Sequence, residues 1–157
     1  MFIIGDKIVY PMHGAGIIEE IEEKMILGEY REYYILRIPC GDMKIMIPID
    51  SCQEIGIRYV ISCEEMEEVL RTLGEETSEM PNNWNRRYRE NMEKLKTGDV
   101  RNVAEVVRNL SRTDREKKLS TGEKKMLANA KQILASEMIL VQDISQDTAF
   151  EIIEKAI

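Results

Sequence analysis

The chain has few of the residues on which several common classes of protein depend. It contains 3 cysteines and 1 histidine among 157 residues, and Cys40, Cys52 and Cys63 form no Cys-x-x-Cys motif. Three scattered cysteines favour buried thiols in a reducing compartment over a disulfide framework, and one histidine leaves too few ligands for a zinc site. No apolar run approaches the roughly 20 residues that cross a bilayer. We therefore expect a cytoplasmic protein with no metal, no cofactor and no membrane contact.

Motifs that mark catalytic sites are also missing. The chain has no Gly-x-Ser-x-Gly, no P-loop, no Gly-x-Gly-x-x-Gly and no His-Glu-x-x-His. Gly14-Ala-Gly16 is only a fragment of a dinucleotide fingerprint and is better explained as a turn that requires positive φ. His13 has no neighbouring nucleophile, and paired glutamates such as Glu19 and Glu20 are typical of a solvated face. We expect neither an enzyme nor a small-molecule substrate.

The net charge of −7 hides an uneven distribution along the chain. Residues 1–75 carry 7 basic and 15 acidic side chains, residues 76–136 carry 14 and 9, and residues 137–157 carry 1 and 5. The three blocks therefore have net charges of −8, +5 and −4. This asymmetry favours two surfaces with different partners, a protein for the first acidic block and nucleic acid for the basic block.

The first 60 residues have the pattern of a small β domain. Short runs of β-branched and aromatic residues at 7–11, 17–26, 30–38 and 43–48 are separated by turn signals. A unit of roughly 55 residues is near the lower limit for a self-supporting core, which predicts a Tudor- or SH3-like size. The run at 43–48 lacks clean alternation, so either both of its faces are covered or one face is a contact surface.

From Ser62 onward the spacing of apolar residues becomes helical. Ser62-Cys-Glu-Glu65 and Ser120-Thr-Gly-Glu123 are capping boxes, and Asn82 or Asn83 and then Asp99 can cap two further helices. We expect helices to about Leu73, to about Lys96, after Asp99, after Ser120 and over about 147–157. The predicted fold class is α+β, with a β domain over residues 1–60 and an all-α domain of about five helices over residues 61–157. Two apolar stripes are predicted to face the core, Val100, Val103, Ala104, Val107 and Leu110 on the third helix and Met126, Leu127, Ala130, Ile133, Leu134 and Met138 on the fourth.

The start of the second expected helix is the most informative part of the basic block. Arg86, Arg87 and Arg89 lie where the helix dipole favours anions and where exposed N–H groups suit a phosphate, which together predict a grip on a DNA backbone. Trp84 shares a helical face with Tyr88, so it is either a core residue or a wedge that stacks on bases, and spacing alone leaves both open. Further cations follow at the end of the third helix and in the fourth: Arg108, Arg112, Arg115, Lys117, Lys118, Lys124, Lys125 and Lys131.

Taken in order, these segments resemble the CarD/CdnL-type bacterial transcription regulators, and the resemblance runs nearly end to end. The first half contributes G-D-K-I-V-Y-P-M-H-G-A-G at Gly5–Gly16, G-E-Y-R-E-Y-Y at Gly28–Tyr34 and I-P-I-D at Ile47–Asp50. The second half contributes N-W-N-R-R-Y-R-E-N-M-E-K-L at Asn83–Leu95, G-D-V-R-N-V-A-E-V-V-R-N-L at Gly98–Leu110 and L-S-T-G-E-K-K-M-L-A-N-A-K-Q-I-L at Leu119–Leu134. The segment around Trp84 is the most specific of them.

The resemblance implies a Tudor-like N-terminal domain that binds the RNA polymerase β subunit by strand-edge pairing. It also implies that the helical domain binds promoter DNA at the upstream edge of the transcription bubble, where Trp84 enters the minor groove near the −10 element. The implied function is a regulator that stabilises the open complex during initiation. Some relatives carry a basic residue where this chain has Met46, so one charge contact to polymerase is in doubt. The polymerase contacts expected are Lys24, Met43, Ile45, Met46, Ile47 and Pro48, and the DNA contacts are Trp84, Arg86, Arg87, Arg89, Lys124 and the adjoining Lys125.

Two other interpretations stay open. A general DNA-binding or nucleoid protein could act without polymerase, although its acidic first half would repel DNA. A protein-interaction adaptor would carry the same basic block only as a solvated face. Binding of polymerase to residues 1–60 separates the first interpretation from the resemblance, and charge reversal at Arg86 and Arg87 tests the second.

Overall fold

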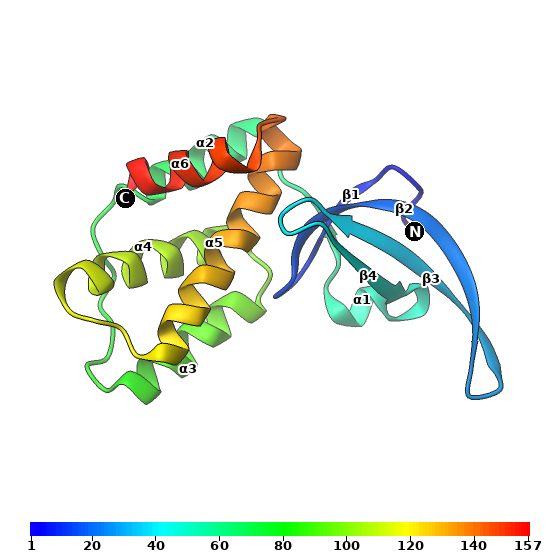
Figure 1. Ribbon diagram of the computed structural model, residues 1–157, viewed down its shortest axis with the longest axis horizontal. Coiled ribbons are helices and arrows are strands. Elements are labelled where there is room, and N and C mark those ends of the chain that lie inside the picture. Colours follow the sequence, from blue (N-terminus) through cyan, green and yellow to red (C-terminus); the bar gives the residue numbers. More distant parts are fainter.

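The computed structural model describes all 157 residues as a small antiparallel sheet followed by a group of helices (Figure 1). The sheet lies at one end of the molecule and the helices at the other, so the predicted α+β class is confirmed. The elements in chain order are β1 (Lys7–Tyr10), β2 (Gly14–Ile26), β3 (Glu29–Ile38), β4 (Met43–Pro48), η1 (Ile49–Ser51), α1 (Cys52–Ile55), β5 (Arg58–Tyr59), α2 (Cys63–Thr72), α3 (Trp84–Lys96), α4 (Val100–Glu116), α5 (Thr121–Gln142) and α6 (Gln146–Ala156).

The sheet has the strand order β4-β3-β2-β1-β5, so β4 forms one edge and the two-residue β5 forms the other. Leu27 and Gly28 join β2 to β3 with φ values of 51° and 79°, and two successive positive φ angles match the right-handed twist of a tight hairpin. The far end of this hairpin extends beyond the neighbouring strands (Figure 1). The sheet therefore presents an open edge at β4 and a projecting hairpin.

The glycines after His13 differ from the predicted turn. Strand β2 already begins at Gly14, and the turn lies just before it, where Met12 has a φ of 73°. Gly14 does have a positive φ, of 117°. Gly16 does not, and a Cβ atom there would lie 2.5 Å from the carbonyl oxygen of Arg37. Glycine is thus required at position 16 by the close approach of a neighbouring strand rather than by its φ angle.

The helical part follows the sequence prediction closely, because its signals are local. Both capping boxes form, at Ser62 and Ser120, and the side chains of Asn83 and Asp99 cap α3 and α4. The two predicted apolar stripes are buried in one core of 28 residues that also takes in the sheet. None of the helices is long and apolar enough to span a lipid bilayer.

A network of polar contacts fastens the sheet to the helices. The guanidinium of Arg58 in β5 donates two hydrogen bonds of 2.9 Å to the carboxylate of Glu137 in α5 and two more to the carbonyl of Gly98 between α3 and α4. Glu137 is 2% exposed and also accepts from the backbone N–H of Ile61 at 3.0 Å. The backbone N–H of Ala15 donates to the hydroxyl of Ser136 at 2.8 Å. The sheet is therefore held against both α5 and the α3–α4 connection.

Candidate nucleic-acid interface

Trp84 is the first residue of α3, and its side chain is half exposed. The side-chain oxygen of Asn83 accepts from the backbone N–H groups of Asn85 and Arg86 at 3.0 and 3.2 Å, which starts the helix at this point. The indole retains 53% of its accessible surface, and it is not among the residues packed against the core. Helical spacing left open whether Trp84 is a core residue or an exposed one. In the structure its ring lies at the surface.

Arg86 and Arg89 add positive charge to the first two turns of α3, the helix that begins at this exposed ring. Both side chains are exposed. Arg86 lies 3.5 Å from Glu90 on the same helix, a solvent-exposed pair worth little. Arg89 has no ion pair or hydrogen-bond partner within the protein. Because their partners are weak or absent, these guanidinium groups are available as donors in the first two turns of α3, the helix that begins with the exposed Trp84.

Arg87 differs from the expectation that it reaches a DNA backbone. It is 7% exposed, and its guanidinium donates to both carboxylate oxygens of Glu123 at 2.6 and 2.7 Å. Burial raises the pKa of Glu123, but the hydrogen bonds from Arg87 and Ser120 together outweigh burial and hold that pKa below its usual value. The Glu123 hydrogen bond also raises the pKa of Arg87. Arg87 is therefore a tie between α3 and α5 rather than a surface contact.

This tie brings the first turn of α5 beside α3. A Cβ atom at Gly122 would lie 3.7 Å from the ring of Tyr88, one turn along from Trp84. Lys124 and Lys125 follow directly on α5, and both are exposed without an ion-pair partner. Figure 1 shows the starts of α3 and α5 together with the α4–α5 turn at the end of the molecule away from the sheet. Four expected DNA contacts and the indole thus belong to one end of the helical part.

The cations of α4 do not act as a single group. Arg108 is 4% exposed and donates to the carbonyl of Thr72 and the hydroxyl of Ser78. Arg112 donates to the carbonyl of Leu73 and the hydroxyl of Thr77. These two arginines hold the connection between α2 and α3 against α4. Sequence reasoning did not find this role, because the acceptors are backbone and hydroxyl oxygens 30 or more residues away.

The expected polymerase contacts are divided between exposed and buried side chains. Met43 and Met46 on β4 are 45% and 37% exposed, whereas Ile45 and Pro48 are half buried. Ile47 is fully buried, so its side chain faces the core and only its backbone can belong to a contact surface. Lys24 lies on the β2–β3 hairpin, exposed and 3.6 Å from Glu22. Since β4 pairs only with β3, its other edge is open.

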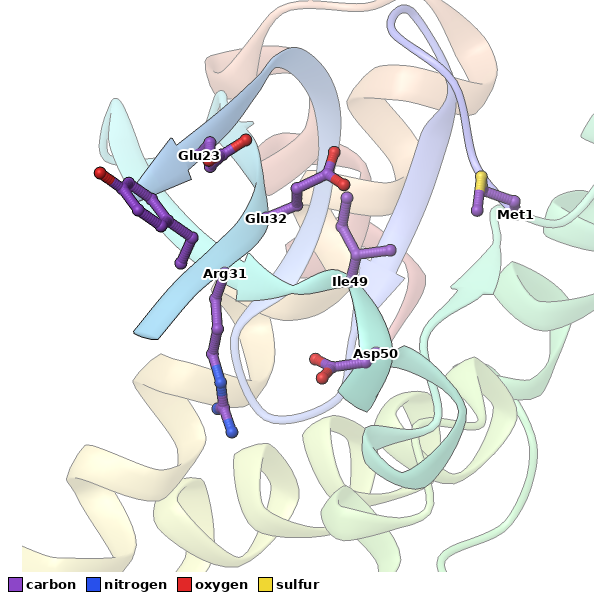
Figure 2. A pocket seen from close by; sticks show the side chains of 7 residues that line it. Met1, Glu23, Arg31, Glu32, Ile49 and Asp50 are labelled. Carbon is purple, nitrogen blue, oxygen red and sulfur yellow. The ribbon is translucent and has the colours of Figure 1, made fainter. Parts of the chain in front are cut away.

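A shallow cleft of about 550 Å³ lies between the β2–β3 hairpin and η1. Figure 2 shows Glu23 and Glu32 on adjacent strands, with Ile49 and Asp50 on the segment after β4. Glu23 and Glu32 stand directly opposite each other in the strand register, an arrangement of like charges that is unfavourable unless water screens it. No group of three or more His, Cys, Asp or Glu side chains is arranged to hold a metal ion. The cleft has the character of an open acidic surface.

Comparison with known proteins gives a consistent result for both parts of the chain. Residues 2–61 match the family model of the CarD-like/TRCF RID domain, and residues 68–154 match that of the CarD C-terminal domain. Over 108 residues the chain is 44% identical to the protein named "Putative transcription factor YdeB" of Bacillus subtilis (strain 168). That similarity covers 69% of this chain and 71% of the relative.

Proposed function

This chain belongs to the CarD-like family of transcription factors, and from that membership we propose that it stabilises the open complex of RNA polymerase at promoters. The sheet binds the polymerase β subunit through the edge of β4, and the far end of the helical part binds promoter DNA at the upstream edge of the bubble. The observation that carries the proposal is the half-exposed Trp84 at the start of α3, with the exposed Arg86 and Arg89 in the first two turns of the same helix.

The free energy that Trp84 must contribute is small. A base stacked on an aromatic side chain contributes about 1–3 kcal/mol, and about 1.4 kcal/mol changes an equilibrium tenfold. The indole shifts the balance between closed and open DNA only by as much as it binds the distorted step better than the intact duplex. Arg86, Arg89, Lys124 and Lys125 add phosphate contacts that hold the ring in place but carry no sequence information. No catalytic group is required.

The contact at β4 makes weak DNA binding sufficient. A strand edge with exposed Met43 and Met46 can add backbone hydrogen bonds and apolar contacts to a partner strand. Once polymerase holds the sheet, the DNA contact becomes intramolecular, and its effective concentration rises. The acidic charge of residues 1–75 favours a protein partner over DNA for this part. The two contacts then support each other without either being strong alone.

Open-complex lifetime tests the wedge. We expect the wild-type protein to lengthen the lifetime and Trp84→Ala to remove about tenfold of that effect, while polymerase binding is retained. Tyr59→Ala, which truncates another exposed aromatic side chain at the opposite sheet edge, is the matched control and should behave as wild type. Equal lifetimes with wild type and Trp84→Ala would exclude the indole from the mechanism.

Two further measurements separate the ends of the molecule. Trp84 is the only tryptophan, so its fluorescence on forked promoter DNA reports directly on the proposed contact. We expect Met46→Glu to abolish retention by polymerase and to leave that fluorescence change intact. A variant that loses both properties, or neither, contradicts the assignment of separate contacts to β4 and α3.

A further inference from the structure

The cations of the helical part fall into two classes by their partners. From Trp84 to the end of the chain, most arginines and lysines either pair with a carboxylate or donate to a carbonyl. Six have no such partner within the protein, and all six are exposed. They are Arg89, Lys124 and Lys125, which belong to the interface described above, Arg115 in the last turn of α4, and Lys117 and Lys118 in the α4–α5 turn that follows.

The α4–α5 turn is short and firmly held. Lys117 leaves α4 with an extended backbone, at φ −151° and ψ 147°. Two residues later Leu119 is 5% exposed, and its backbone N–H donates to the carboxylate of Asp114 at 3.3 Å. Ser120 then caps α5. Because the buried Leu119 and the capping Ser120 hold the backbone of this turn, the exposed side chains of Lys117 and Lys118 are attached to an ordered segment.

No carboxylate forms an ion pair with Arg115, Lys117 or Lys118, although Asp114 and Glu116 lie in the same segment. Asp114 is engaged with the backbone of Leu119, and Glu123 is buried against Arg87. Glu116 is exposed and has no ion-pair partner, so it is the one free carboxylate between residues 114 and 125. The helix dipole favours Arg115 and Lys117 at the C-terminus of α4, but it disfavours cations near the N-terminus of α5, which the turn leads into after Lys118. Three exposed cations without an ion-pair partner, against two carboxylates in the same segment, leave a net positive charge at this place that suits an external anion.

We propose that the α4–α5 turn is a second DNA contact, in which Arg115, Lys117 and Lys118 bind backbone phosphates of the duplex beside the step that Trp84 enters. This rests on the proposed function, because the starts of α3 and α5 and the α4–α5 turn lie at the same end of the helical part (Figure 1). Lysine binds phosphate as a point charge without regard to base sequence. The turn therefore adds affinity and orientation to the complex, and it leaves promoter preference unchanged.

Salt dependence of binding measures this contact. The substrate is forked promoter DNA with a duplex arm, and the full-length variant carries Arg115→Ala, Lys117→Ala and Lys118→Ala. Each phosphate neutralised on B-DNA contributes about −0.9 to the slope of log affinity against log salt. We expect the slope of the triple variant to be smaller in magnitude by about 2–3. Between 50 and 200 mM salt, three lost contacts then change the ratio of wild-type to variant affinity by about 40-fold.

A charge-matched variant controls for loss of net charge. Arg71→Ala, Arg101→Ala and Lys155→Ala remove the same three charges from α2, the start of α4 and α6. We expect its slope to equal that of the wild type. All of the replaced side chains are exposed, so thermal unfolding of both triple variants should stay close to wild type. Equal slopes for the two triple variants would overturn the proposal.

A second substrate locates the contact and separates this inference from the proposed function. When the duplex arm is removed, the α4–α5 variant and wild type should bind with the same affinity. A difference that persists on the single strand alone assigns the cations to another nucleic acid and overturns the proposal. If wild-type protein binds forked DNA with a change in Trp84 fluorescence while the α4–α5 variant keeps the wild-type slope, only this inference fails. No binding or fluorescence change by wild type overturns the proposed function itself.

Discussion

Replacing Arg87 with methionine tests whether the tie between α3 and α5 stabilises the fold. The side chain of Glu123 is fully buried and that of Arg87 is 9% exposed, so water cannot compensate the carboxylate that remains. Removing one partner of a buried ion pair destabilises a protein by about 3–5 kcal/mol, because the other charge is left without a counterion. We expect Arg87→Met to lower the free energy of unfolding by that amount.

The double variant Arg87→Met with Glu123→Leu gives the sharper result. Replacing a whole buried pair with apolar side chains of similar volume is often neutral, but Glu123 also completes the capping box with Ser120, whose loss destabilises by about 1 kcal/mol. We therefore expect the double variant to be more stable than Arg87→Met alone and within about 1–2 kcal/mol of wild type.

Urea unfolding followed by circular dichroism measures these differences. Arg89→Met is the matched control on the same helix, exposed and without a partner, and it should change stability by less than about 0.5 kcal/mol. The reasoning is refuted if Arg87→Met behaves like that control, or if the losses of the two single variants simply add in the double variant.

Three more outcomes are expected from stability measurements. Gly16→Ala should destabilise by about 1–3 kcal/mol in urea, because its Cβ would lie 2.5 Å from a strand carbonyl; wild-type stability would contradict the close approach. Glu137→Ala should destabilise by about 2–4 kcal/mol, since it removes the carboxylate partner of Arg58 and leaves the backbone N–H of Ile61 without an acceptor; a wild-type midpoint would show that the junction contributes little. The pKa of Glu123 is lowered in the folded state, so its contribution is present above the unfolded value of about 4.3 and is lost as pH falls through the folded value. Urea midpoints from pH 7 to 3 should therefore fall less steeply for Glu123→Gln than for wild type, and parallel curves would refute this.

The elements predicted correctly are those whose signals are local. Capping boxes at Ser62 and Ser120 place helix starts to the residue, because the serine and the glutamate three positions later contact each other directly. Runs of β-branched and aromatic residues separated by turn signals likewise predicted where β1 to β4 lie along the chain. Helix α1 and strand β5 were missed, since they have four and two residues and are too short for a periodic pattern.

The location of the candidate site could be predicted from the sequence, but not which of its residues are exposed. Trp84 and its neighbours mark the start of α3, but only the packing of α3 shows that the indole is exposed. Arg87 resembles its neighbours in sequence, and its burial depends on Glu123, 36 positions away. One signal was present: Arg87, Asn91 and Leu95 recur every four residues, and all three are buried. The interpretation of α3 instead followed the face of Trp84 and Tyr88.

The contacts of Arg58 limit movement between the sheet and the helices. A single guanidinium holds both the α3–α4 connection and α5, so the sheet has little freedom to pivot on the helices. The polymerase-facing edge of β4 and the DNA-facing start of α3 are then held at a fixed distance and orientation. A rigid protein cannot adjust when the two sites that it contacts move apart. One base pair inserted between those sites rotates one relative to the other by about 34–36°. We therefore expect the effect of this protein on a promoter to depend on the distance and helical rotation between the DNA that polymerase holds and the base step that Trp84 contacts, as well as on the bases at that step.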